Sequence, residues 1–148
     1  MGFYTVNCFS VNNITWDKKP LFEISKDTIC IWQIRIIPDA SRIEGLSAVL
    51  KSDELARANR YRHEKDRRRF ITSRGSLRIL LANYLKKEPV DIEFDITPDK
   101  KPILKSHVNN LHFNTSHSED FVLIAIAGSE VGIDVEKTDS TFDWEDIL

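Results

Sequence analysis

The hydrophobic positions of this 148-residue chain repeat with two different periods. Residues 28–37 alternate apolar and polar side chains and are rich in β-branched and aromatic residues, which predicts a strand that Pro38 ends. Because side chains two apart share a face, the strand is expected to gather Cys30, Trp32, Ile34 and Ile36 on one side. Residues 1–27 show no clear period, and within them Asn12-Asn13 and Lys18-Lys19-Pro20 are typical of turns or loops.

A helical pattern follows the first strand. Leu46, Val49 and Leu50 recur at helical spacing, and Ser52 is predicted to cap a second helix that begins near Asp53. A longer helix is predicted from about Glu64 to Leu85. Its apolar positions fall on one face at a period of 3.6 residues; they are Phe70, Leu77, Leu81 and Tyr84, with Leu80 beside them.

Beyond Val90 the pattern changes again, to short strands. Gly128 and Ser129 separate the last two apolar runs and predict a hairpin turn. One strand, then helices, then several strands predict an α+β fold. The expected strands lie within residues 90–98, 102–105, 111–118, 121–127 and 131–136.

Composition narrows the class of protein. The chain is 41% hydrophobic and 30% charged, which suits a folded globular domain. No apolar run approaches the roughly 20 residues that cross a bilayer, and the first residues show no secretory signal pattern. A cytoplasmic location without membrane contact is therefore expected. Cys8 and Cys30 stand in unrelated contexts and are predicted to be reduced and packed.

Charge is distributed unevenly along the chain. Between Arg57 and Arg78 lie nine basic residues against two acidic ones, whereas the residues from Asp134 onward are acidic. Helical arginines suit bidentate contacts with phosphate, although a solvated helix face would have the same composition. A nucleic-acid surface is less favoured, because the pI is about 6.1 and no aromatic stacking pattern accompanies these arginines.

Two carboxylates stand close together in Gly132-Ile133-Asp134-Val135-Glu136. On a strand, Asp134 and Glu136 would point to the same side, where they repel each other unless a proton or a cation lies between them. Mg²⁺ typically takes one or two carboxylates together with water and phosphate oxygens. The pattern suits a magnesium site, and an exposed strand face with two solvated acids is the alternative.

Small polar residues surround one histidine in Phe113-Asn114-Thr115-Ser116-His117-Ser118. His117 could donate to a phosphate or move a proton, and a turn closed by its own side chains is the alternative. No GxSxG elbow accompanies Ser116 and His117, so a serine hydrolase is not indicated. Lys100-Lys101-Pro102 adds a basic pair before a predicted strand.

The order of these segments resembles the 4′-phosphopantetheinyl transferase superfamily, of the surfactin-synthetase-activating type. Over roughly residues 45–140, the chain is similar to that family's L-s-x-x-E-x-x-R-x-x-R-[FY], GKP, F-N-[IL]-S-H-[ST] and G-[IV]-D-[IVL]-E segments. In this chain Lys100 replaces the usual glycine, and Thr115 replaces a branched apolar residue. The resemblance implies transfer of phosphopantetheine from coenzyme A to a serine of an apo acyl or peptidyl carrier protein.

The resemblance also implies roles for single residues. Asp134 and Glu136 match the acids that bind Mg²⁺, and the resemblance places both, with His117, in the catalytic site. The residues that match contacts to coenzyme A are Arg57, Arg69, Lys101, Ser116 and His117.

The resemblance further implies a chain made of two similar halves, with an antiparallel sheet packed against helices. Residues 1–130 would form the N-terminal half-domain and residues 131–148 the first strand of the second half. The family's W-x-x-K-E-[AS] segment has no match here, so the chain is expected to be an incomplete fragment with weak or no activity. An uncovered apolar face would favour a homodimer or a domain swap. A coenzyme A- or nucleotide-binding module without catalysis is the alternative function.

Overall fold

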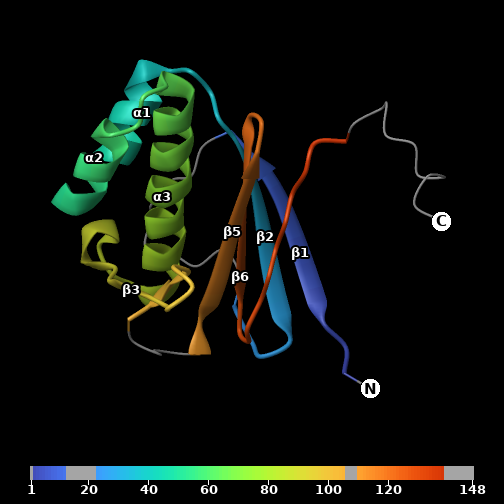
Figure 1. Cartoon of the computed structure of the whole chain (residues 1–148). Coiled ribbons are helices and arrows are strands. Elements are labelled where there is room, and N and C mark those ends of the chain that lie inside the picture. Colours follow the sequence, from blue (N-terminus) through green and yellow to red (C-terminus); the bar gives the residue numbers. More distant parts are fainter. Residues whose placement is uncertain (1, 13–22, 106–109, 139–148) are drawn as a thin grey trace.

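The computed structural model describes residues 2–12, 23–105 and 110–138, and it shows a sheet covered by helices on one face (Figure 1). The four-stranded sheet has the spatial order β1 (Thr5–Val11), β2 (Thr28–Arg35), β6 (Phe121–Ala127), β5 (His112–Ser118). Between β2 and β5 the chain forms α1 (Ala40–Ser47), α2 (Ser52–Asn59), α3 (Glu64–Leu85), a 3₁₀ turn (Pro89–Asp91), β3 (Phe94–Ile96) and β4 (Pro102–Leu104). The predicted α+β fold is confirmed.

Pairing in the sheet is antiparallel except at one edge. Strand β2 pairs antiparallel with β6, and β6 pairs antiparallel with β5. Strand β1, in the segment without a clear sequence period, pairs parallel with β2. It lies at the edge and contributes Phe9, whose ring stacks on Trp32 with centroids 4.4 Å apart. Since Asn7 and Ser10 interrupt the apolar pattern, the edge strand escaped prediction.

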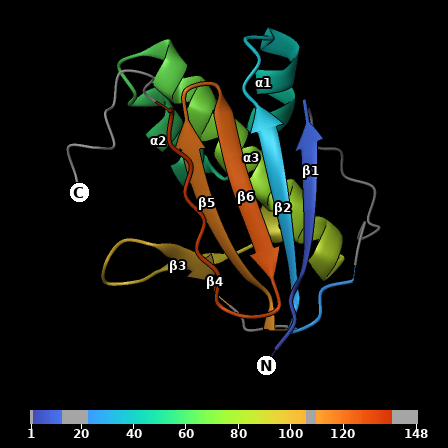
Figure 2. The same cartoon turned by 90° about the vertical axis from the view of Figure 1, so that its right-hand side faces the viewer.

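The core lies between the sheet and α3. Cys30, Trp32 and Ile34 are buried on the face of β2 that meets the helices, as the alternation predicts. Strand β6 is central and is apolar at every position, because both of its faces are covered over much of its length. Figure 2 shows the opposite face of the sheet, on the side away from α1, α2 and α3.

Helix α3 has the predicted bounds, and Leu77, Leu80 and Leu81 on it are buried. It passes very close to α1. A Cβ atom on Gly75 would lie 2.9 Å from the carbonyl oxygen of Leu46, so the glycine allows the two helices to approach.

Two local predictions were wrong. Helix α2 begins at Ser52, so Lys51 is the N-cap; its backbone N–H donates to Oε2 of Glu54 at 2.9 Å, which takes the place of a Ser52 cap. Cys8 is exposed rather than packed, whereas Cys30 is buried, and both are free thiols. In the described part of the chain, none of the helices combines the length and apolar character that a membrane span requires.

The segment with the two acids is not a strand, contrary to prediction. After Gly128 and Ser129 the chain turns back, and residues 131–138 run beside β5 on the sheet face away from the helices (Figure 2). Its N–H groups bond to side chains instead of a backbone ladder: Ile133 donates to Oδ1 of Asn114 at 3.0 Å and Val135 donates to Oγ of Ser116 at 3.1 Å. Similarly, β3 is shorter than predicted because its first residues form the 3₁₀ turn.

Candidate functional site

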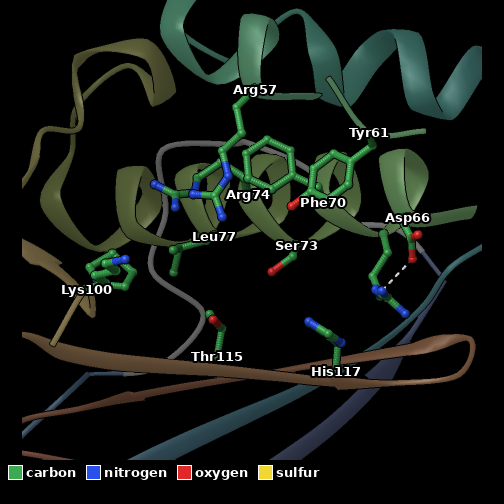
Figure 3. Close-up of a pocket in the computed structure, with 12 residues that line it drawn as sticks. Arg57, Tyr61, Asp66, Phe70, Ser73, Arg74, Leu77, Lys100, Thr115 and His117 are labelled. Atoms are coloured by element: carbon green, nitrogen blue, oxygen red, sulfur yellow. Dashed lines mark hydrogen bonds and ion pairs between the residues drawn. The ribbon is translucent and has the colours of Figure 1, made fainter. Parts of the chain in front are cut away.

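A pocket of about 230 Å³ opens between α3 and β5 (Figure 3). Helix α2 and the turn between β3 and β4 complete its walls. Cationic side chains dominate the pocket, and one acid faces them. The charged and titratable groups that line it are Arg57, Arg69, Arg74, Lys100, His117 and Asp66.

Two structural periods bring these groups together. Asp66, Arg69, Phe70, Ser73 and Arg74 follow one another at alternating steps of three and one residues on α3 and therefore share a face. The alternation of β5 turns Thr115 and His117 toward that helix. Figure 3 shows both side chains rising from the strand toward α3.

Aromatic rings support the arginines at one end of the pocket. The guanidinium of Arg57 lies 4.9 Å from the centroid of Phe70, and Tyr61 packs against the same ring at 5.7 Å. A guanidinium stacked over an aromatic face has its N–H groups in its own plane, where they point outward and can bond an anion. This end of the pocket is thus suited to a phosphate group.

At the other end, Arg69 is held by Asp66. Its Nη2 donates to Oδ1 of Asp66 at 2.6 Å. His117 stands nearby, and its pKa lies below the ordinary value because of burial and the positive charge of Arg69, with Asp66 opposing the shift. His117 is therefore mainly neutral at neutral pH, and it could donate one N–H to a phosphate oxygen.

Not every arginine of the basic segment serves the pocket. Arg78 is 2% exposed and donates to Oε2 and Oε1 of Glu54 at 2.8 and 2.9 Å. It also donates to the carbonyls of Pro89 and Ile92 at 2.9 and 2.8 Å. Arg78 thus joins α2, α3 and the segment before β3 inside the protein, where it cannot meet a ligand.

The basic pair before β4 is split between two cavities. Lys100 lines the pocket and has a φ of 64°, a left-handed conformation in which glycine is favoured. The turn thus accounts physically for the glycine that the resembled family has at this position. Lys101 instead lines a separate cavity with His112 and Glu130. The structure therefore does not bring Lys101 together with Arg57 and Arg69.

Ser116 lies on the opposite face of β5 from His117. Its Oγ donates to Oδ1 of Asp134 at 3.1 Å, which places Asp134 on the side of the sheet away from α3. Both acids are exposed, and Oδ1 of Asp134 also accepts from the N–H of Val135. Their oxygens suit Mg²⁺, but within residues 2–12, 23–105 and 110–138 no three His, Cys, Asp or Glu side chains group closely enough to hold a metal ion. The acids thus fit part of a magnesium site.

Comparison with protein families decides the relationship of the chain. Residues 35–129 match a family described as 4′-phosphopantetheinyl transferase, N-terminal. The chain belongs to this family. The matched residues of this transferase family include α2, α3 and β5, which form the pocket.

Individual transferases support the assignment. The chain is 39% identical over 137 residues to the 4′-phosphopantetheinyl transferase HetI of Nostoc sp., which covers 90% of this chain and 58% of HetI. It is 37% identical to a putative 4′-phosphopantetheinyl transferase, slr0495, of Synechocystis sp., over 70% of this chain and 44% of that protein. It is 26% identical to Sfp of Bacillus subtilis over 64% of this chain and 42% of Sfp. The chain thus spans about half the length of these transferases.

Sequence reasoning did not single out Arg74 in this pocket, nor Glu54 beside it. Arg74 lines the pocket, and Glu54 on α2 accepts hydrogen bonds from both Arg74 and Arg78. The sequence signal was that Arg74 and Arg78 are four residues apart, which places them on one face of the helix. The acid on the other helix that pairs with them could not be identified from spacing alone.

Proposed function

We propose that this chain supplies the coenzyme A-binding part of a 4′-phosphopantetheinyl transferase, which moves phosphopantetheine to a serine of an apo acyl or peptidyl carrier protein with Mg²⁺. Residues 1–130 would act as the N-terminal half-domain, and residues 131–148 would begin the second half. The observation that supports the proposal is the cationic pocket between α3 and β5 in a chain of this family.

The pocket residues have separate tasks in this proposal. Arg57 and Arg69 offer forked donors to phosphate oxygens of coenzyme A, and His117 adds one N–H beside them. Lys100 lines the pocket whereas Lys101 does not, so the proposal assigns the lysine contact to Lys100. Asp66 already bonds to Arg69, and a phosphate must share or displace that bond.

The two acids contribute to the transfer step. Asp134 and Glu136 would hold Mg²⁺, which when bound neutralises charge on the diphosphate and favours in-line attack. Ser116 fixes the Asp134 carboxylate through its hydroxyl, which makes Ser116 a positioning residue in this proposal rather than a direct contact to coenzyme A. Because two carboxylates fit only part of a magnesium site, we expect these 148 residues alone to transfer phosphopantetheine weakly or not at all. The mass increase of an apo carrier protein measures this transfer.

A calorimetric titration with coenzyme A, with and without Mg²⁺, tests the proposal. Binding that strengthens with Mg²⁺ and loses this dependence in Asp134→Ala is the expected result. Glu44→Ala, which removes an exposed acid on α1, is the matched control and should leave binding unchanged. Binding of coenzyme A that neither Mg²⁺ nor Asp134→Ala alters would favour the non-catalytic coenzyme A-binding module.

A further inference from the structure

Arg74 is the pocket arginine without a role so far. Its side chain is 17% exposed and lines the cavity beside Arg57. Among the described residues, its guanidinium makes one hydrogen bond, in which Nη1 donates to Oε1 of Glu54 at a long 3.3 Å. A guanidinium has five N–H donors, so most of the donors of Arg74 have no protein acceptor within the described residues.

The surroundings of Arg74 leave its charge incompletely balanced. The guanidinium lies 4.9 Å from the centroid of Phe94 and 5.9 Å from that of Phe70, so apolar rings replace water around it. Burial lowers the pKa of Arg74, Glu54 opposes that shift, and the positive charges of Arg57 and Arg78 add to it. An anion in the pocket would relieve this crowding of positive charge.

Glu54 bonds to Arg74, but its shorter side-chain hydrogen bonds are with Arg78. Both of its oxygens accept short bonds of 2.8 and 2.9 Å from Arg78, which leaves the longer contact for Arg74. The carboxylate is 7% exposed and stands on α2, so it is fixed relative to α3. Glu54 therefore orients Arg74 but leaves most of its N–H donors without an acceptor among the described residues.

We propose that Arg74 is a further anion-binding residue of this pocket and that Glu54 is its positioning residue. The ligand class is a phosphate group, because a partly dehydrated guanidinium with free planar donors matches phosphate geometry. That this phosphate belongs to coenzyme A rests on the proposed function above.

The test compares Arg74→Gln, Arg74→Lys and the control Arg67→Gln in titrations with coenzyme A and with inorganic pyrophosphate. Arg67 is on the same helix, pairs with Glu64 and does not line the pocket. Losing a charge-assisted bond should weaken the binding of both ligands by about ten- to a hundredfold in Arg74→Gln. Arg74→Lys should recover part of the loss, and Arg67→Gln should stay within about twofold of the original chain.

The role of Glu54 is tested by a double-mutant cycle. Glu54→Gln should weaken binding in the original chain and cause no further loss when Arg74 is already Gln. All affinities are measured at a temperature where circular dichroism shows every variant folded. An equal loss in both backgrounds would show that Glu54 supports only the fold and would overturn its positioning role.

The outcomes separate this inference from the proposed function. Coenzyme A binding that Arg74→Gln leaves unchanged overturns the inference and leaves the proposed function standing. Pyrophosphate binding that depends on Arg74, without coenzyme A binding, supports the inference and counts against the proposed function. Binding of neither ligand by the original chain overturns both.

Discussion

Arg78→Met should destabilise the fold strongly. The substitution keeps an apolar stem of similar reach but removes four hydrogen bonds, two to Glu54 and one each to the carbonyls of Pro89 and Ile92. The carboxylate of Glu54 would then stay buried with only the long bond from Arg74 and the N–H of Lys51. Breaking a buried ion pair in this way costs about 3–5 kcal/mol.

That loss is large compared with the stability of a domain of this size, about 5–15 kcal/mol. At roughly 2–4 °C per kcal/mol, Tm should fall by about 6–20 °C. Urea unfolding followed by circular dichroism measures the free energy, and thermal unfolding measures Tm. Arg67→Met is the control, because its ion pair with Glu64 is partly solvent-exposed and its loss should change stability by no more than about 0.5 kcal/mol.

The pairing itself predicts coupling between the two residues. In the double variant Glu54→Gln with Arg78→Met, neither the Glu54 carboxylate nor the Arg78 guanidinium remains buried without the other, so its loss should be smaller than the sum of the two single losses. If Arg78→Met costs less than about 1 kcal/mol, or if the two losses simply add, Arg78 does not hold α2 and α3 together as argued.

Three further changes test other parts of the structure. Lys100→Gly should raise the free energy of unfolding in urea by about 1 kcal/mol, since it relieves a left-handed φ, and should weaken coenzyme A binding in the same preparation. The folded state lowers the pKa of His117, so protonation favours the unfolded chain and stability should fall as pH drops below 6.5; His117→Gln should flatten this part of the pH profile. Gly128→Ala should cost about 2 kcal/mol or more in urea unfolding, because its Cβ would overlap the backbone oxygen of Ser25, and an unchanged midpoint would contradict that packing.

The sequence predicted elements well where one period runs long enough to dominate. Helix α3 keeps its apolar spacing from Phe70 to Tyr84 within its 22 residues, and both of its predicted ends are correct. The prediction of a strand at 131–136 failed although its side chains alternate between partly buried and exposed. Alternation reports which side chains face the protein, but it does not show whether the backbone N–H groups find a strand or, as here, the side chains of Asn114 and Ser116.

Helical spacing could not separate the arginines of the site. Arg74 and Arg78 are four residues apart, yet Arg74 lines the pocket and Arg78 is buried in the core. Arg78 makes two short bonds to Glu54, 24 residues before it, and two more to carbonyls that the turn after α3 brings to the same place, whereas the bond from Arg74 to Glu54 is long. Such long-range partners follow from the packed fold and not from the local pattern.

The side chains around His117 on β5 alternate between the two faces of the sheet, and each face makes different contacts. His117 and Thr115 face α3 and line the cationic pocket, whereas Ser116 and Asn114 face away and hold the segment with Asp134. Strand β5 is the last strand of the described sheet, so under the proposed function a ligand at His117 would have to pass this edge to reach Asp134 and Glu136. Residues 114–117 of β5 are therefore all polar because alternate side chains act on opposite faces of the strand. Thr115 and His117 line the pocket, and Asn114 and Ser116 bond to the segment that contains Asp134.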